Sequence, residues 1–149
     1  MPEFSTARVV SHLRLLHTPL LPSAGPELWW RGELQPVPLH RSRVVFRGRR
    51  VWSHLEPADQ VYRDELRTLW RASGIRAPLR GPLGCVMAFA GRRGRRPDLT
   101  NLLKAVEDAG NGFLWEDDCQ IRLLLGWIEG WGPEVEPFVE VAAWRLGEG

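Results

Sequence analysis

The chain has 149 residues and a formal net charge of +2, which suits one domain with a buried core. No apolar run approaches the roughly 20 residues that a membrane span needs, and the first residues lack the pattern of a secretory signal. Cys85 and Cys119 occur in no metal-ligand spacing, so we expect reduced thiols. These features argue against a membrane-spanning protein and a disulfide-stabilised secreted domain, and they predict a cytoplasmic protein.

The charge is divided between two parts of opposite sign. Residues 1–96 hold 17 Arg against 7 acidic residues, whereas residues 97–149 hold 3 basic residues against 11 acidic ones. Like charges that lie close together repel each other unless a partner neutralises them. The arginine runs therefore predict a surface that binds a polyanion. The candidate contacts to the polyanion are Arg41, Arg43, Arg47, Arg49, Arg50, Arg92, Arg93, Arg95 and Arg96.

Lys104 is the only lysine among 20 basic residues. A chain so biased toward arginine accepts arginine wherever any surface cation suffices. Lysine differs because it carries a compact ammonium on a flexible stem instead of a planar fork. Lys104 is therefore a candidate functional residue, although chance retention on a solvated helix face is the alternative.

The predicted elements begin after an N-terminal extension, residues 1–27, which precedes a folded domain over residues 28–149. A strand is expected from Leu28, followed by an edge or loop segment at Pro36-Val37-Pro38. Residues 44–52 then predict a hairpin with a basic tip.

A helix is expected from Pro57 to about Ser73, with Val61, Leu66 and Leu69 on its buried face and Tyr62 and Trp70 beside them. Residues 83–90 are nearly all apolar, which predicts a central strand. The strand leads into the basic loop 91–96.

The next helix follows Pro97, with Asp98 at the N-cap position. Leu99, Leu102, Leu103 and Val106 form the apolar stripe expected to face the core. Asn101, Lys104 and Asp108 share the opposite face, where Asn101 is a further candidate contact to the polyanion. The alternative interpretation is structural: Asp98 caps the helix, and Lys104 and Asp108 form an ordinary ion pair between residues four apart.

Gly110-Asn111-Gly112 is expected to end this helix. Strands are then predicted over residues 113–115, 120–129 and 138–146, and the acidic triplet Glu116-Asp117-Asp118 precedes the second of them. We expect the chain to fold back so that this triplet and Asp98 become neighbours. Packed carboxylates repel each other unless a cation or a proton lies between them, so the pattern predicts a metal site.

One run of residues resembles the RusA family of Holliday junction resolvases, which are bacterial and phage endonucleases. The resemblance covers about residues 28–146, and its carboxylate block is more specific than its N-terminal part. The matching residues are Asp98-Leu99-x-Asn101-Leu102-x-Lys104, then Asp108-Ala109, Asn111-Gly112 and Trp115-x-Asp117-Asp118-x-Gln120-Ile121.

The resemblance implies a compact α+β domain, with a small mixed or antiparallel sheet and two main helices packed on it. It implies a homodimer that cuts branched DNA, such as a four-way junction, using Mg2+, for which Mn2+ is expected to substitute. Asp98 and Asp118 match metal-binding aspartates, with Asp117 beside the second, and Lys104 matches the catalytic lysine. Asp98, Lys104 and Asp118 are therefore the expected catalytic residues.

The chain departs from the family pattern at Thr100, where the family carries an aspartate. Mg2+ accepts one or two carboxylates plus waters, so we expect Asp98 and Asp118, with help from Asp117 or Glu116, to hold one ion still, with Thr100 as a weak ligand. A two-metal site is harder to build without a bridging anion. The alternative functions are a branched-DNA-binding homologue that has lost turnover, and a domain whose acidic cluster is only surface charge.

Overall fold

The structure is a computed structural model that describes residues 25–40, 43–47, 50–54, 56–75 and 77–147. Most of the predicted N-terminal extension therefore lies outside the described residues, as do Arg41 and Arg49. No helix in the described part of the chain is long and apolar enough to cross a membrane.

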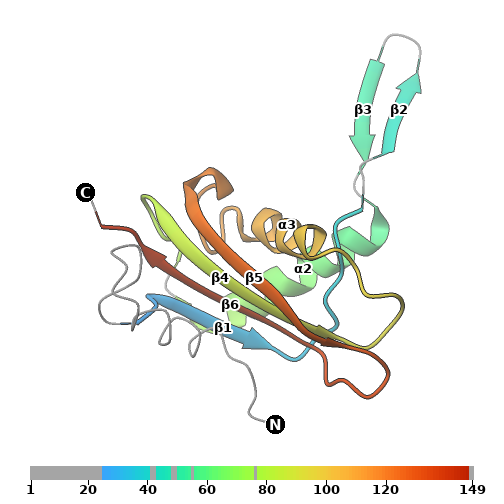
Figure 1. The fold of residues 1–149 in the computed structure, drawn as a ribbon. Helices are drawn as coiled ribbons and strands as arrows, with labels where there is room; N and C mark the ends of the chain where they lie inside the picture. Colours follow the sequence, from blue (N-terminus) through green and yellow to red (C-terminus); the bar gives the residue numbers. More distant parts are fainter. Residues whose placement is uncertain (1–24, 41–42, 48–49, 55, 76, 148–149) are drawn as a thin grey trace.

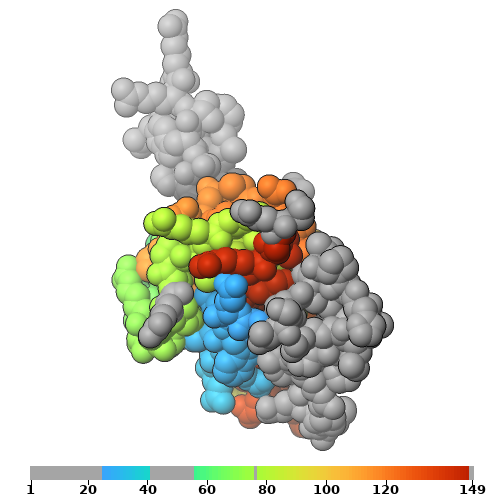
Figure 2. Space-filling model, turned by 90° about the vertical axis from the view of Figure 1, so that its left-hand side faces the viewer, coloured from blue at the N-terminus to red at the C-terminus, as the bar shows by residue number. Residues whose placement is uncertain are grey.

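The body of the protein is a four-stranded sheet with two helices against one of its faces (Figure 1). The strands lie in the order β1 (Leu28–Gly32), β6 (Phe138–Arg145), β4 (Leu83–Gly91) and β5 (Ile121–Trp131). Only β4 and β5 run parallel, so the sheet is mixed. Figure 2 shows this order from one end of the sheet, with β1 in blue, β6 in red and β4 in light green. The predicted α+β class is confirmed.

The core lies between the sheet and the helices α2 (Pro57–Ala72) and α3 (Leu99–Gly110). On β4, alternate side chains such as Cys85, Met87 and Phe89 join this core because successive strand residues point to opposite faces. β4 is buried along its whole length, as expected for a central strand. Arg67 of α2 donates through Nε to the carbonyl oxygen of Ala109, 2.9 Å away, which ties α2 to the last turn of α3.

The parallel pairing of β4 and β5 determines where α3 lies. Parallel neighbours cannot be joined by a tight turn and need a crossover connection, usually a helix. Here α3 is that connection, and it returns along the sheet from the end of β4 to the start of β5 (Figure 1). The start of α3 therefore lies near the end of β4, and its last turn lies near the start of β5.

The buried face of α2 differs from the predicted one. Tyr62, Leu66 and Trp70 are buried at helical spacing, whereas Val61 is 66% exposed and Leu69 is 37% exposed. Residues four apart share a face of a helix. The face with Tyr62, Leu66 and Trp70 carries the aromatic rings that pack toward β1, and the face with Val61 and Leu69 carries none. Trp30 of β1 meets Trp70 edge-to-face, with ring centroids 5.8 Å apart. The prediction for Val61 and Leu69 was wrong.

The segment after α3 also differs from the prediction, because residues 112–114 form a turn and Trp115 makes isolated bridges to Leu79 and Asn111 instead of belonging to a strand. The amides of Phe113 and Leu114 donate back to the carbonyl oxygen of Gly110, and the Gly112 amide donates to that of Trp115. The buried Trp115 then donates its indole N–H to the carbonyl oxygen of Glu107, 3.2 Å away. A one-turn 3-10 helix, η1 (Asp118–Gln120), leads from here into β5.

The predicted basic hairpin is present as β2 (Arg43–Arg47) and β3 (Arg50–His54), paired antiparallel with Arg47 opposite Arg50. It stands away from the sheet and the helices (Figure 1). It pairs with no strand of the four-stranded sheet, so its backbone belongs to a separate two-stranded sheet.

The two faces of α2 can be compared by substitution. We expect Leu66→Ala to lower the free energy of unfolding by about 2–5 kcal/mol, because it leaves a cavity in the core. Val61→Ala, five residues earlier on the exposed side, is expected to change it by no more than about 0.5 kcal/mol. Urea denaturation of both variants measures this, and equal effects would contradict the observed orientation of α2.

Candidate functional site

The loop between β4 and α3 is held in place by its first arginine. Arg92 donates through Nε to the carbonyl oxygen of Val135 at 3.0 Å and through Nη2 to Glu136 at 3.1 Å. Its backbone amide donates to Gln35 Oε1 at 2.8 Å. These contacts engage the guanidinium of Arg92 and stabilise the loop, and its contact with DNA stays a prediction.

Trp131 fixes the next part of the loop, because its indole N–H lies 3.2 Å from the carbonyl oxygens of both Arg93 and Gly94. The side chains of Arg93, Arg95 and Arg96 are exposed. None of them forms an ion pair within the described part of the chain. Three unneutralised guanidinium groups on a fixed backbone are suited to binding phosphates.

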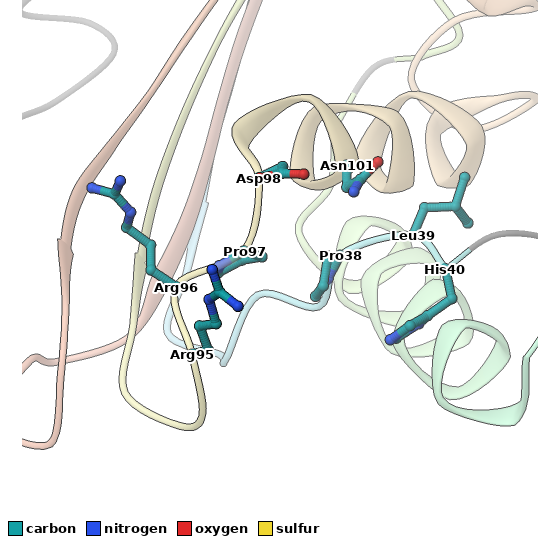
Figure 3. Close-up of a pocket in the computed structure, with 8 residues that line it drawn as sticks. All are labelled: Pro38, Leu39, His40, Arg95, Arg96, Pro97, Asp98 and Asn101. Carbon is teal, nitrogen blue, oxygen red and sulfur yellow. The ribbon is translucent and has the colours of Figure 1, made fainter.

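A cleft of about 650 Å³ opens between this loop, the start of α3 and the segment after β1 (Figure 3). The backbone amide of Leu39 donates to the carbonyl oxygen of Asn101 at 3.0 Å, which joins two of its walls. Its lining residues are Pro38, Leu39, His40, Arg95, Arg96, Pro97, Asp98 and Asn101.

Asp98 has the backbone conformation of an N-cap, but its side chain makes no capping hydrogen bond. Its carboxylate is exposed, and no described cation pairs with it. In Figure 3 the carboxylate and the side chain of Asn101 lie one after the other along the start of α3. Capping therefore does not account for the aspartate at this position, and its oxygens are available to a ligand.

Lys104 lies at the centre of an acidic cluster. Its Nζ is 3.2 Å from Asp108 Oδ1, 3.2 Å from Asp118 Oδ2 and 3.9 Å from Glu107 Oε2. Partial burial by itself lowers the pKa of Lys104, but hydrogen bonds to Asp108 and Asp118 outweigh it and hold the pKa above its usual value. Lys104 is therefore a cation at neutral pH and bridges α3 to η1.

Glu107 is the member of this cluster that the sequence interpretation missed. Burial raises its pKa, and the negative charges of Asp118 and Asp108 add to that effect, while Lys104 opposes it. Its position three residues after Lys104 was a usable signal, since residues at this spacing are neighbours on a helix.

Asp117 and Asp118 have different surroundings although they are adjacent. Asp117 Oδ1 accepts a hydrogen bond from the Cys119 amide at 2.9 Å, and this contact lowers the pKa of Asp117. The Gln120 side chain accepts from the Asp117 amide, which completes a capping box. Asp117 therefore caps the start of η1, whereas Asp118 forms an ion pair with Lys104.

Thr100 is exposed and precedes Lys104 by four residues, so the two share one side of α3. It lines a second hollow, of about 500 Å³, against Gly126, Trp127 and Ile128 of β5. Asp98 and Arg96 line the same hollow. Position 100 therefore lies between Asp98 and the Lys104 cluster.

The predicted metal ligands are hard oxygen donors, which suit Mg2+ or Mn2+ in kind. Asp98 precedes Lys104 by six residues, about 9 Å along a helix axis, while Asp118 contacts Lys104 directly. Within the described residues no three His, Cys, Asp or Glu side chains are gathered as a metal site. The donors available on this side of α3 are Asp98, Asp118 through its second oxygen, and the Thr100 hydroxyl.

Together, an α+β fold, an arginine-lined cleft and a lysine–carboxylate cluster on one helix define a domain suited to a polyanionic substrate. A model of the family described as Endodeoxyribonuclease RusA matches residues 33–141. The chain therefore belongs to the RusA family, which confirms the resemblance. Members of this family bind branched DNA and act as Holliday junction resolvases, and the family in general depends on a divalent metal. A search of the curated proteins finds no significant match to the chain.

Thr100→Asp tests the donor set. The added carboxylate lies between Asp98 and the Lys104 cluster, so we expect it to tighten Mn2+ binding by about tenfold, since ligand charge tunes the affinity of such sites. Thr100→Asn, of the same shape but neutral, is the matched control. Calorimetric titration measures both, and equal affinities for Asp and Asn would contradict a metal at this position.

Proposed function

We propose that this protein is a metal-dependent, structure-selective endodeoxyribonuclease that resolves four-way DNA junctions by two matched phosphodiester cuts. The observation that carries the proposal is the contact of Lys104 with Asp118, 3.2 Å apart, inside the segment that matches the family. It joins the one lysine of the chain to one of the two aspartates expected to bind metal. Lys104 follows Asn101, which lines the arginine-lined cleft, by three residues on α3, the spacing of neighbours on one helix face.

Asp98, Asp118 and Thr100 are the proposed ligands of Mg2+, for which Mn2+ substitutes. A divalent ion held there would make a bound water more acidic and would neutralise charge on the phosphate. Because its pKa is held high, Lys104 keeps its proton at neutral pH. Its ammonium group offsets negative charge that develops on the phosphate or on the leaving oxygen.

Arg93, Arg95 and Arg96 are the proposed contacts to the DNA backbone beside the scissile phosphate. Such contacts position the duplex without reading base sequence. Asn101 lines the same cleft and adds an amide. The hairpin arginines Arg43, Arg47 and Arg50 remain sequence predictions of a second backbone contact, together with Arg41 and Arg49.

Resolution of a four-way junction needs two cuts and therefore two active sites, which a two-fold homodimer supplies. The last and central strands were the expected interface elements. In the sheet, β6 and β4 are each hydrogen-bonded on both sides. These strands therefore contribute to a dimer only through a face of the sheet, whereas β1 and β5 are its edge strands among the described residues.

A second candidate function is a branched-DNA-binding protein without turnover. Thr100 in place of a family aspartate favours it, because the position between Asp98 and Asp118 then lacks a charge. Binding and cleavage of one substrate separate the two functions.

The cleavage test uses a synthetic four-way junction with Mg2+ or Mn2+. We expect paired nicks with the unmodified protein. Lys104→Met should slow cutting by about a hundredfold, the typical cost of removing one charge-stabilising group, and Lys104→Arg should recover only part of the rate because its fork is planar. Asp118→Asn is expected to abolish cutting while binding persists. Tight binding without cutting under either metal would establish the non-catalytic function instead.

The salt dependence of junction binding tests the basic cleft. Each lost phosphate contact is expected to reduce the slope of log affinity against log salt by about 1. Arg95→Ala should show this reduction. Arg145→Ala removes an exposed arginine that pairs with Glu27 at the end of β6 and should leave the slope unchanged. Equal slopes for the two variants would remove Arg95 from the DNA interface.

A further inference from the structure

His40 is fixed at one wall of the cleft by contacts to both helices. Its backbone amide donates to Asp59 Oδ2 at 3.1 Å, and the preceding amide, of Leu39, donates to the carbonyl oxygen of Asn101 at 3.0 Å. The first contact reaches α2 and the second reaches α3. The position of this residue is therefore set by the fold.

The imidazole ring is oriented by the same carboxylate. His40 Nδ1 lies 2.8 Å from Asp59 Oδ1, and Asp59 is 5% exposed. An ionised carboxylate only accepts hydrogen bonds, so Nδ1 carries a proton in this contact. Among the described residues, this buried carboxylate pairs with His40 alone, through the backbone amide and the ring. A group buried at such cost beside a surface histidine serves to hold the ring.

The rest of the ring is open to the cleft. The His40 side chain is 53% exposed although its Nδ1 is engaged. In Figure 3 the ring extends from the chain toward the side of the cleft where Arg95 lies. With Nδ1 paired to Asp59, Nε2 is the ring nitrogen that is left for a ligand.

We propose that His40 is a further DNA contact, which donates from Nε2 to a backbone phosphate in this cleft, and that Asp59 is its positioning residue. The inference rests on the proposed function, because the cleft must receive a DNA strand. Arg95 lies across the cleft from His40 (Figure 3), so one strand can be contacted from both sides. The alternative is that the pair merely fastens the segment after β1 to α2.

Donation from both ring nitrogens requires the imidazolium form, so the proposed contact links DNA binding to uptake of a proton. The described charged groups around the ring are Asp59 from α2, Asp98 from the start of α3, and Arg95 and Arg96 from the loop.

Two amide substitutions separate the two roles. The amide of asparagine reproduces the position of Nδ1 and can pair with Asp59, whereas the longer glutamine amide reaches the position of Nε2. Junction binding is measured by fluorescence anisotropy in EDTA, so that cleavage does not intervene, and folding is checked by thermal unfolding.

We expect His40→Asn to keep the unfolding temperature and to weaken junction binding about tenfold, the size of one hydrogen bond to a charged group. His40→Gln is expected to recover part of that loss. If His40→Asn binds as tightly as the unmodified protein, or more tightly than His40→Gln, the pair only fastens the chain and the proposal is overturned. Gln60→Ala, at an exposed residue beside Asp59, is the control and should bind normally.

The pH profile gives a readout that a fastening role would not change. Affinity of the unmodified protein should rise as the pH falls, and the rise should be smaller in His40→Gln. Asp59→Asn removes the carboxylate that orients the ring, so the rise should be smaller there as well. Profiles of equal steepness in the unmodified protein and His40→Gln would overturn the proposal.

The same experiments distinguish this inference from the proposed function. If the unmodified protein neither binds nor cuts the junction, the proposed function fails and the cleft has another ligand. If it binds and cuts while every His40 variant matches it in affinity, the proposed function stands and the His40 contact is rejected.

Discussion

The parallel pairing of β4 with β5 is the constraint on which the rest of this structure depends. It requires a crossover, and α3 provides it, so the chain leaves the end of β4 through the arginine loop and returns to the start of β5 through the acidic triplet. Asp98 therefore lies at the start of this helix, and Asp118 contacts Lys104 near its middle. Lys104, between them in sequence, reaches Asp118 and joins the two parts of the site.

Charge of both signs is concentrated around α3, and the two signs are stabilised differently. The acidic side chains near Lys104 are held together by one ammonium group, which limits their mutual repulsion. Arg93, Arg95 and Arg96 have no such compensation among the described residues, and the contacts of Arg92 and Trp131 keep them together. A phosphate backbone would neutralise these arginines, which is the role we propose for them.

Sequence reasoning was reliable where a pattern is local. The strand at residues 83–90, the helix after Pro97 and its end at Gly110 are all present, because apolar periodicity and helix-breaking residues act over a few positions. The sequence predictions were wrong where two local patterns are similar and tertiary packing favours one of them. Val61 and Leu69 are apolar enough for a core, yet the row with Tyr62 and Trp70 fills more space. Residues 113–115 have strand-forming side chains, but hydrogen bonds to Gly110 hold them in a turn.

The sequence by itself determined which chemistry is available. The lone lysine, the aspartates on either side of its helix and the separated charges identified the family and the candidate residues, since these depend only on residue type and spacing. Only the tertiary structure decided which of these groups meet. In the structure, Arg92 forms an ion pair with Glu136, and Asp117 caps η1. Glu107 joins the acidic side chains around Lys104, and His40 pairs with Asp59, 19 residues away. Such choices follow from the crossover and from burial, which bring distant residues together through contacts that no local pattern encodes.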